Sequence, residues 1–519
     1  MNKIEAIKTE RDGLVVRDMI AQYAKSGWAS IPEADIQRLK WHGLFLRNPT
    51  PGFFMIRVRM PGGKTGSYQL KALAAIAGTY GNGVLDITTR QQIQLRHIRI
   101  EDVPAVFAKM EEVGLTALQT GMDNVRNVMT CPVAGLAPDE VSDATQLVRA
   151  INEEILGNPA YSNLPRKFNV AVTGCTDNCV HMETQDLALV PATRDDGRGK
   201  HIGYNVLAGG KLGSGGYRIA SPLDIFVTEG DALALCRAII EIFREHGARE
   251  SRTQARLAFL LEEWGEGRFR EEVETRVGKK LVSAGVDARK TVEKSHVGIY
   301  RQKQPAMNYV GLKVLVGRIA HDDLARIAAL AEKYGTGEIR ISPAQAVIIT
   351  NVSDRKIGDL DEEPLVKQFA YNPSPVYKGL VSCVGSDYCN MAVIETKGRA
   401  VATAKALEAR LGSTLKPITM HWSGCPAACG NHLVADIGLL GKKARIEGKS
   451  VDAVDIYVGG RSGPDPKLAV KIMEDVPCDR LPLVLEGLVP YHAREKMHRV
   501  RGGAKKLAAG MQAPNASAA

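Results

Sequence analysis

The chain has 519 residues, which is too long for one compact core and suggests about three domains. Hydrophobic residues make up 45% and charged residues 24%, as in a globular protein rather than a disordered one. No apolar run reaches the roughly 20 residues of a membrane helix, and the first segment lacks the apolar stretch of a secretory signal. We therefore expect a cytoplasmic protein that does not enter a membrane. The net charge of +10 suits nucleic acid, an acidic protein partner or a polyanionic cofactor, and charge alone does not choose among them.

An internal repeat organises the predicted elements. A strand, FFMIRVRM, begins at Phe53, and an amphipathic helix, a glycine turn and an alternating strand follow in LAAIAGTYGNGVLDITTRQQIQLRHI from Leu73. The same order recurs in YVGLKVLV from Tyr309 and IAALAEKYGTGEIRISPAQAVIITNV from Ile327. The aligned positions include Tyr80 with Tyr334, Gly81 with Gly335, Gly83 with Gly337, and Gln91 with Gln345. Two copies of one unit are therefore expected.

A second pair of segments repeats at nearly the same offset. TGCTDNCVHMETQDLALV from Thr173 matches SGCPAACGNHLVADIGLL from Ser423, and both contain Cys-x3-Cys. Each then reaches an aspartate before an apolar strand, Asp186 in one and Asp436 in the other, and Cys131 falls opposite Cys383. Because the order and spacing of separate segments agree, chance similarity is a poor explanation. We predict a duplicated α+β architecture with pseudo-two-fold symmetry.

The two halves differ in residues that carry chemistry. The first half has Arg90 opposite Ala344, Lys167 opposite Pro417, and Asn169 opposite Thr419, whereas the second half has Cys389 opposite Ala137. One half is thus rich in cationic and polar groups at these positions, and the other in thiols. An active site between the halves would combine a redox metal centre with an anion-binding wall.

Four cysteines form the pattern Cys383-x5-Cys389-x35-Cys425-x3-Cys429. In a reducing compartment such grouping indicates metal ligation more than disulfides. Zinc sites more often use Cys-x2-Cys pairs, whereas wider pairs suit a four-iron cluster held by four thiolates. The spacing favours a cluster and leaves zinc or buried structural cysteines as alternatives.

The remaining cysteines do not complete a second such set in the sequence. Cys175 and Cys179 repeat the Cys-x3-Cys pair, but no fourth partner is visible, so we expect a structural role rather than a second cluster. Cys236 lies in the apolar helix DALALCRAIIEIF and is interpreted as core, and Cys478 has no visible partner.

At these residues the chain resembles a known family. SCVGSDYCNMAVIETK and HWSGCPAACGNH are similar to the cluster-binding segments of sirohaem nitrite and sulfite reductases. FFMIRVRMPGG, DITTRQQIQLR, LQTGMDNVRN, LPRKFNV and QKQPAMNYVGLKVLVGRI resemble the family's other motifs in the same order, from about residue 40 to about residue 500. Within the family, the similarity is greatest to ferredoxin-dependent assimilatory nitrite reductases, which are enzymes of nitrate assimilation.

The resemblance implies a three-domain α+β fold, in which a 4Fe–4S cluster and sirohaem lie side by side. Its implied parts are an N-terminal extension (1–44), paired ferredoxin-like half-domains (45–118 with 296–370), a first sirohaem- and substrate-binding domain (119–295), a second domain for the cluster and sirohaem (371–505), and a disordered tail (506–519). Cys383, Cys389, Cys425 and Cys429 would hold the cluster, and Cys429 would also ligate the sirohaem iron.

Sirohaem carries eight carboxylates, so its pocket must supply hydrogen-bond donors and positive charge. The resemblance assigns cofactor contact to Thr88, Thr89, Arg90, Gln94 and Arg166. The planar fork of arginine matches carboxylates well. Taken alone, each threonine is more simply interpreted as an ordinary strand residue, whereas Arg90 is a stronger prediction because its counterpart is alanine.

The resemblance assigns substrate contact to Arg57, Arg126, Lys167 and Asn169. Lys167 and Asn169 lie two apart, so on a strand both would project to the same face. Arg57 and Arg59 have the same parity, so one could serve sirohaem while the other reaches substrate.

Asn169 favours nitrite over sulfite as the substrate. In the family resemblance, nitrite reductases carry Asn at this place and sulfite reductases carry a second Lys. Sulfite is largely dianionic near neutral pH and benefits from another cation, whereas nitrite is a monoanion. The expected reaction is the six-electron reduction of nitrite to ammonium, with assimilatory sulfite reduction to sulfide as the alternative.

The electrons are expected from reduced ferredoxin or a flavodoxin-like donor, since no Gly-x-Gly-x-x-Gly fingerprint follows a strand. An acidic ferredoxin suits the positive net charge. A rival of another class is a non-enzymatic electron-transfer or nucleic-acid-binding scaffold, supported by HAREKMHRVRGGAKK from His492. That stretch is also typical of a terminal helix, and a scaffold gives no reason for four cluster-type cysteines. We expect an enzyme that acts as a monomer and binds no nucleic acid.

Overall fold

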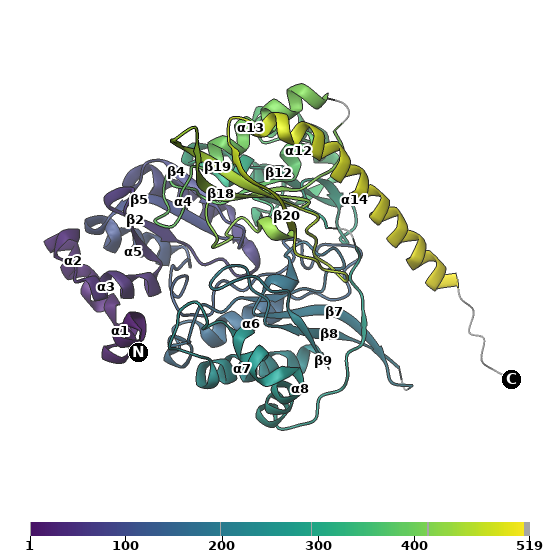
Figure 1. Cartoon of the computed structure of the whole chain (residues 1–519), viewed down its shortest axis with the longest axis horizontal. Helices are drawn as coiled ribbons and strands as arrows, with labels where there is room; N and C mark the ends of the chain where they lie inside the picture. Colours follow the sequence, from purple (N-terminus) through teal and green to yellow (C-terminus); the bar gives the residue numbers. More distant parts are fainter. Residues whose placement is uncertain (1, 198, 292, 413–414, 513–519) are drawn as a thin grey trace.

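The computed structural model describes residues 2–197, 199–291, 293–412 and 415–512. Within these ranges the chain forms four five-stranded sheets with helices packed on them (Figure 1). The predicted α+β duplication is confirmed, because the sheets come in two matched pairs. Among the described helices, none is long and apolar enough to cross a membrane.

The first pair of sheets has one strand order and exchanges its edge strands. One sheet runs β1 (Leu44–Arg47), β2 (Thr50–Arg57), β5 (Ile93–Arg99), β4 (Val84–Ile87) and β13 (Arg318–Ala320). The other runs β11 (Gly298–Arg301), β12 (Met307–Lys313), β15 (Ala346–Ser353), β14 (Glu338–Ser342) and β3 (Lys64–Gly66). Each sheet therefore ends on a strand from the opposite half of the chain, β13 against β4 and β3 against β14. The exchange closes an edge of each sheet that would otherwise offer unpaired backbone groups.

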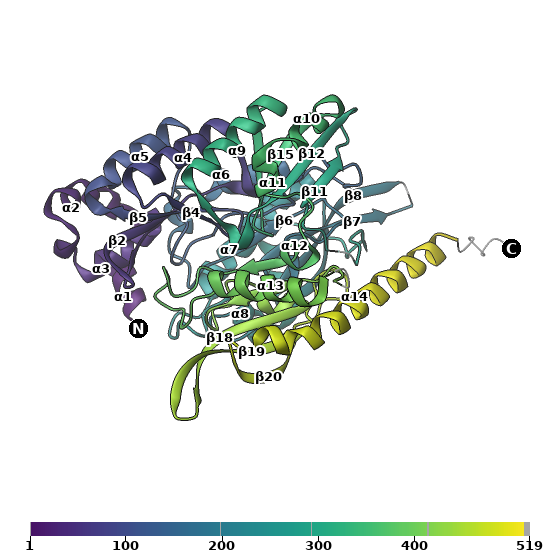
Figure 2. The same ribbon diagram turned by 90° about the horizontal axis from the view of Figure 1, so that it is seen from above.

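Helices α4 (Ser67–Tyr80) and α9 (His321–Tyr334) pack side by side on these sheets (Figure 2), and α5 (Val103–Glu112) packs against α4. Both paired helices bury residues at the helical spacing i, i+3, i+4, i+7: Leu70, Leu73, Ala74 and Ala77 in α4, and Leu324, Ile327, Ala328 and Ala331 in α9. The core they cover extends without interruption through both sheets. The two ferredoxin-like halves are thus one packed unit.

The second pair of sheets carries the Cys-x3-Cys segments. The third sheet contains β6 (Val170–Val172), β7 (Leu187–Asp195), β8 (Lys200–Ala208), β9 (Ser221–Val227) and β10 (Val286–Asp287). The fourth runs β16 (Leu380–Ser382), β17 (Met420–Ser423), β18 (Ile437–Ile446), β19 (Lys449–Val458) and β20 (Val470–Pro477). In each sheet a short strand pairs in parallel with the strand that follows it in the chain, β6 with β7 and β17 with β18. The loop between the two strands carries the Cys-x3-Cys pair. The pseudo-two-fold relation therefore extends to these sheets.

Helices complete both regions. The third sheet is accompanied by α6 (Thr145–Ile155), α7 (Glu229–His246) and α8 (Leu257–Val277), and the fourth by α13 (Lys397–Leu411) and α14 (Leu481–Gln512). The short helices α10 (Ile357–Asp361), α11 (Pro364–Gln368) and α12 (Pro375–Lys378) connect the second sheet to the fourth.

The N-terminal extension is folded onto the body of the protein. It contains α1 (Lys3–Glu10), α2 (Ile20–Ser26) and α3 (Glu33–Arg38). Arg38, only 2% exposed, donates to the carbonyl of Ile7 at 2.8 Å, and Trp41 donates from its indole to the carbonyl of Ser162 at 2.8 Å. The second bond ties the extension to the region of the third sheet.

At the C-terminus, α14 runs away from the body of the molecule (Figure 1). The tail was predicted to begin at residue 506, but residues 506–512 continue the helix. The physical reason is composition, since KLAAGMQ is rich in residues with high helix propensity. The rest of the predicted tail, 513–519, lies outside the described residues.

Candidate active site

A pocket opens where the two halves meet, and it gathers nearly all the predicted site residues. Its lining includes Arg57, Thr88, Thr89, Arg90, Gln94, Arg126, Lys167, Asn169, Cys383, Cys389, Cys425 and Cys429. Of the predicted set, Arg166 is missing from this lining. Residues up to Asn169 belong to the first half, and the four cysteines belong to the second. The expected arrangement is present. The first-half residues form a polar, cationic wall, and the four cysteines form a thiol wall opposite it.

The thiol wall is built at the ends of two parallel strands. β16 and β17 pair in parallel with Ser382 opposite Trp422, so Cys383 and the loop after β17 leave the sheet at the same edge. The backbone N–H of Gly424 donates to the Cys383 sulfur at 3.1 Å. At Gly430 a Cβ would lie 1.9 Å from the Trp422 carbonyl oxygen, so only glycine fits there. The loop that carries Cys425 and Cys429 is thereby folded tightly against its own strand.

First-half residues anchor the thiol wall. Thr89 donates from its hydroxyl to the carbonyl of Cys429 at 2.9 Å. The guanidinium group of Arg96 lies over the ring of Tyr388, next to Cys389, at 4.9 Å from the ring centre, and Arg318 of the second half lies over the same ring at 5.2 Å. These contacts set the position of the cysteines against the cationic wall across the interface.

Arg57 and Arg126 share one loop as their support. Arg57, the last residue of β2, donates from Nη1 to the Thr120 carbonyl at 3.1 Å. Arg126 donates to the same carbonyl at 2.9 Å and to the carbonyl of Met122 at 2.8 Å. The Nε–H of each arginine is buried and has no hydrogen-bond partner among the described residues. Because a buried donor without a partner is costly, these groups fit a ligand that supplies acceptors.

Lys167 and Asn169 lie just before β6, with the buried Phe168 between them. Both line the pocket, as their spacing of two predicts. The backbone N–H of Asn169 donates to the Asp186 carboxylate at 2.8 Å, which fixes the chain at this point. Its side-chain oxygen is buried and without a hydrogen-bond partner among the described residues.

Burial and mutual repulsion make the cationic wall electrostatically unfavourable on its own. Burial lowers the pKa of Arg57 and of Arg90 to about 10. It also lowers the pKa of Arg126 and of Lys167 well below their usual values, and neighbouring arginines lower both further. Because an anion in the pocket would relieve this cost, the wall is suited to binding one.

Two arginines lie elsewhere than the motifs suggested. Arg166 points to Asp123, with 3.7 Å between its Nη1 and the carboxylate, and its Nη2 lies 3.4 Å from the Ser214 hydroxyl. Arg59 is 2% exposed and donates to the Asn152 side chain and to backbone carbonyls, so it does not share the pocket with Arg57. β2 ends at Arg57, and the strand parity that related the two arginines ends there too.

The sequence interpretation missed three charged residues of the pocket. Arg47 and Lys397 line the pocket, and burial lowers the pKa of Arg47 to about 9. Asp86 also lines it, with Arg96, Arg318 and Lys397 around its carboxylate. Only Arg47 had a local signal, since LFLR reads as a short strand that ends in a cation.

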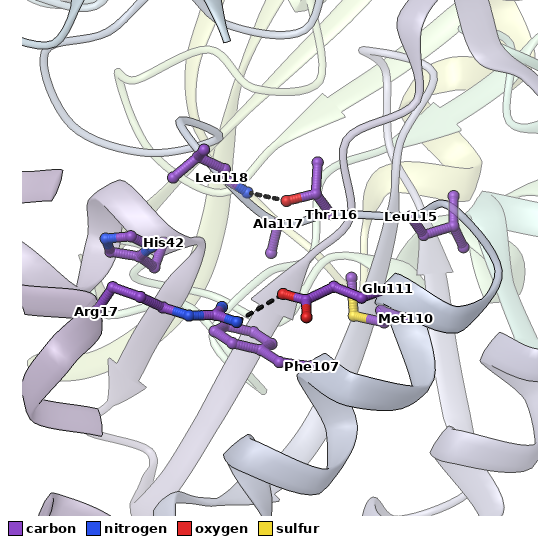
Figure 3. A pocket seen from close by; sticks show the side chains of 9 residues that line it. All are labelled: Arg17, His42, Phe107, Met110, Glu111, Leu115, Thr116, Ala117 and Leu118. Carbon is purple, nitrogen blue, oxygen red and sulfur yellow. Dashed lines mark hydrogen bonds and ion pairs between the residues drawn. The ribbon is translucent and has the colours of Figure 1, made fainter. Parts of the chain in front are cut away.

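A second hollow lies between the N-terminal segment and α5, apart from the predicted residues (Figure 3). Arg17 pairs there with Glu111 at 2.6 Å and stacks 4.7 Å over the ring of Phe107. The other lining groups are mainly apolar, and no cysteine is among them. This hollow offers neither redox ligands nor unpaired cations.

Two family models match this chain, one over both ferredoxin-like halves and the other over the region of the third sheet. The nitrite/sulfite reductase ferredoxin-like half domain matches residues 47–113 and again 300–366. The nitrite and sulphite reductase 4Fe-4S domain matches residues 121–281. The ferredoxin–nitrite reductase of Synechococcus elongatus is 44% identical over 496 residues, which cover 94% of this chain and 96% of that protein. The chain belongs to the nitrite and sulfite reductase family.

Other relatives of this reductase span distant organisms. The chloroplastic ferredoxin–nitrite reductase of Spinacia oleracea is 39% identical, covering 94% of this chain and 85% of that protein. The assimilatory ferredoxin-dependent nitrite reductase of Haloferax mediterranei is 35% identical, covering 96% and 90%. The solved structure of the Mycobacterium tuberculosis NirA protein superposes with a TM-score of 0.88 at 30% identity, covering 93% of this chain and 92% of that one. The predicted duplicated fold is thereby confirmed.

The pocket of this reductase fits the cofactors of the family. Three of its cysteines are at least partly buried and Cys429 is exposed to the pocket. No three of their sulfur atoms all lie within 4.8 Å of one another, which is a wider spacing than the ligands of one tetrahedral ion have. The unpaired Nε–H groups of Arg47, Arg57 and Arg126 suit a polycarboxylate such as sirohaem.

Proposed function

We propose that this reductase converts nitrite to ammonium with six electrons taken from reduced ferredoxin. The observation that carries the proposal is the pocket itself, in which four cysteines of one half face an anion-binding wall of the other half. The curated relatives named ferredoxin–nitrite reductase support the same activity.

The cofactor ligands follow from the two walls. In this proposal the thiol wall of Cys383, Cys389, Cys425 and Cys429 holds the 4Fe–4S cluster. Thr88, Thr89, Arg90 and Gln94, which line the pocket, would contact sirohaem, and Cys429, the most exposed of the four thiols, would be a ligand of both groups. When bound, the two groups would supply one-electron transfer chemistry for the reduction of the substrate.

The cationic wall positions and polarises the substrate. The guanidinium groups of Arg57 and Arg126 are held by shared carbonyls, so they donate to the oxygen atoms of nitrite without reorganising. Lys167 adds a cation that no hydrogen bond or ion pair with a described residue neutralises. Its ammonium donates a hydrogen bond to a nitrite oxygen and passes a proton as the N–O bond breaks.

Asn169 supports nitrite over sulfite. It is 2% exposed and lies beside Lys167, where a second ammonium would raise the positive potential of the wall. A neutral amide retains a hydrogen-bond donor for a monoanion.

The proposed donor and location also rest on charge and cysteine chemistry. A net charge of +10 attracts a small acidic ferredoxin. All nine cysteines are free, as in a reducing compartment, which supports a cytoplasmic location.

The test is a steady-state assay of the purified protein with reduced ferredoxin, comparing ammonium formed from nitrite with sulfide formed from sulfite. We expect kcat/KM to be at least about tenfold higher for nitrite, equivalent to about 1.4 kcal/mol. Faster formation of sulfide would replace nitrite by sulfite as the principal substrate.

The role of Lys167 is tested by Lys167→Met, which should lower kcat/KM for nitrite about 100-fold. The absorption spectra of sirohaem and of the cluster should be unchanged in this variant. Lys405→Met, at an exposed position on α13, is the matched control and should leave activity unchanged. Equal activities of the two variants would remove Lys167 from the mechanism.

A further inference from the structure

Four buried metal-binding side chains gather away from the thiol wall, and we name them the Cys3His cluster. They are Cys131, Cys175, Cys179 and His296, and their sulfur and nitrogen atoms all lie within 4.8 Å of one another. Their exposed fractions are 0%, 2%, 6% and 1%, respectively. The sequence showed the three cysteines, but the fourth partner comes from the segment just before β11, 165 residues from Cys131.

His296 is held in the orientation that a ligand needs. Its Nε2 lies 3.5 Å from the Cys131 sulfur, and its Nδ1 lies 3.1 Å from the hydroxyl of Tyr309. Metal-binding histidines usually donate their second ring N–H to an oxygen in this way. The backbone of His296 has φ of +57°, which is uncommon for a residue other than glycine. Such strain persists where surrounding structure enforces it and often marks a functional position.

The loop around Cys175 is arranged for a thiolate. The backbone N–H of Asp177 donates to the Cys175 sulfur at 3.3 Å, and the N–H of Cys175 donates to the Thr173 hydroxyl at 3.0 Å. At Gly174 a Cβ would lie 1.8 Å from the Ser142 carbonyl oxygen, so the loop closes onto its neighbour only with glycine. Backbone donors to sulfur stabilise the deprotonated form, which is the form that binds metal.

The dimensions of the cluster suit a single ion. Tetrahedral zinc binds thiolates at about 2.3 Å, which places the sulfur atoms about 3.8 Å apart. This separation lies within the 4.8 Å limit of the group, whereas a four-iron cluster spaces its thiolates more widely. We propose that the Cys3His cluster binds one Zn²⁺ ion. Because four protein ligands fill the tetrahedron, the ion is structural and leaves no position for substrate.

The position of the ion explains what it does. Cys175 and Cys179 follow β6, which begins one residue after Asn169, and Met129, near Cys131, contacts Arg90 at 3.7 Å. His296 lies at the entry to the second ferredoxin-like sheet. The ion therefore joins the rear of the substrate wall to the neighbouring sheet. It stands where the first half would hold the counterpart of the 4Fe–4S cluster, since Cys131 aligns with Cys383 and the Cys-x3-Cys pairs align with each other.

The test is elemental analysis and zinc K-edge X-ray absorption of the purified holoenzyme from zinc-supplemented cells. We expect about one zinc per chain beside about five irons, four from the cluster and one from sirohaem, with three sulfur neighbours at about 2.3 Å and one nitrogen at about 2.0 Å. The zinc edge is specific for this element, so the haem and cluster do not obscure it.

The variant Cys175→Ser/Cys179→Ser should lower zinc at least about tenfold, and Cys236→Ser, at a buried cysteine of α7, should retain it. The wild-type measurement decides even where the double variant fails to fold. Zinc below about a tenth of an equivalent in the wild type, zinc bound without sulfur, or more than about five irons in its place would overturn the proposal. A disulfide among the three cysteines in the denatured, alkylated holoenzyme would overturn it as well.

Discussion

Gln91 and Gln345 occupy equivalent positions in the two halves, and each donates from its side chain to a backbone carbonyl of the other half. Gln91 donates to Ile341 at 3.1 Å, and Gln345 donates to Ile87 at 3.2 Å. Both residues have positive φ, +57° and +59°, at the turn between two strands. These two reciprocal hydrogen bonds at the interface follow the pseudo-two-fold symmetry of the repeat.

Each glutamine also forms a hydrogen bond with the backbone of a residue next to a cysteine, but the two cysteines belong to different sites. Gln345 exchanges hydrogen bonds with the backbone of Ser382, next to Cys383, whereas Gln91 accepts from the backbone of Thr130, next to Cys131. Gln345→Leu should therefore speed the loss of cluster iron to a chelator about tenfold, because about 1.4 kcal/mol of support is removed from the thiol wall.

Gln91→Leu is the matched control, because it makes the same change on the side of the interface away from the thiol wall. It should leave the rate of cluster loss near that of the wild type. Equal rates for both variants would show that Gln345 does not position Cys383.

Asp86 forms ion pairs with three cations behind the thiol wall. It is 2% exposed, with Arg96 at 2.7 Å, Arg318 at 3.1 Å and Lys397 at 3.2 Å. Asp86→Asn should lower the free energy of unfolding by about 3–5 kcal/mol, because it leaves buried cations without their counterion. Urea unfolding at pH 7 measures the change, with the exposed Asp359→Asn as control.

The pH dependence of Asp86 has a definite sign. Burial alone raises the pKa of its carboxyl, but Lys397, Arg96 and Arg318 hold that pKa well below its usual value. Its contribution to stability is thus present above the unfolded pKa of about 3.9 and is lost as the pH falls below it. A variant as stable as the wild type at pH 7 would contradict this account.

Asn169→Lys tests which side chain selects the substrate. The change adds an ammonium beside Lys167 and should raise the ratio of sulfite to nitrite kcat/KM at least about tenfold. Asn169→Leu, which removes the amide without adding charge, should lower nitrite reduction and leave the ratio nearer to that of the wild type. If both variants change the ratio equally, charge at this position does not determine selectivity.

His42 makes the N-terminal segment sensitive to acid. Burial lowers its pKa to about 4, and its Nε2 lies 2.8 Å from the Leu14 carbonyl. Since the unfolded chain binds the proton near pH 6.5, the stability due to His42 is full above that pH and is lost as the pH falls toward 4.

His42→Gln retains a donor for Leu14 but does not titrate. Between pH 7 and pH 5 the wild type should lose about 2 kcal/mol more stability than this variant. Urea unfolding at the two pH values measures the difference. Equal losses would show that folding does not change the pKa of His42.

Much of the site was predictable because the repeat and the motifs are local patterns. The two-residue spacing of Lys167 and Asn169 placed both on the pocket side, and the Cys-x3-Cys pairs identified the loops after β6 and β17. Arg59 shows the limit of such patterns, since parity relates two residues only while the strand continues.

The sequence by itself determined the duplication, the helical and strand periods, and the residue types available at each position, because these depend on neighbours a few residues apart. Only the tertiary structure decided the exchange of β3 and β13, the cations around Asp86 and the pairing of His296 with Cys131. Except for Arg96, which is 10 residues from Asp86, those partners are far apart in the sequence, with 232 residues between Arg318 and Asp86 and 165 between His296 and Cys131, so they meet through sheet pairing and core packing. No local pattern records where such distant segments come together.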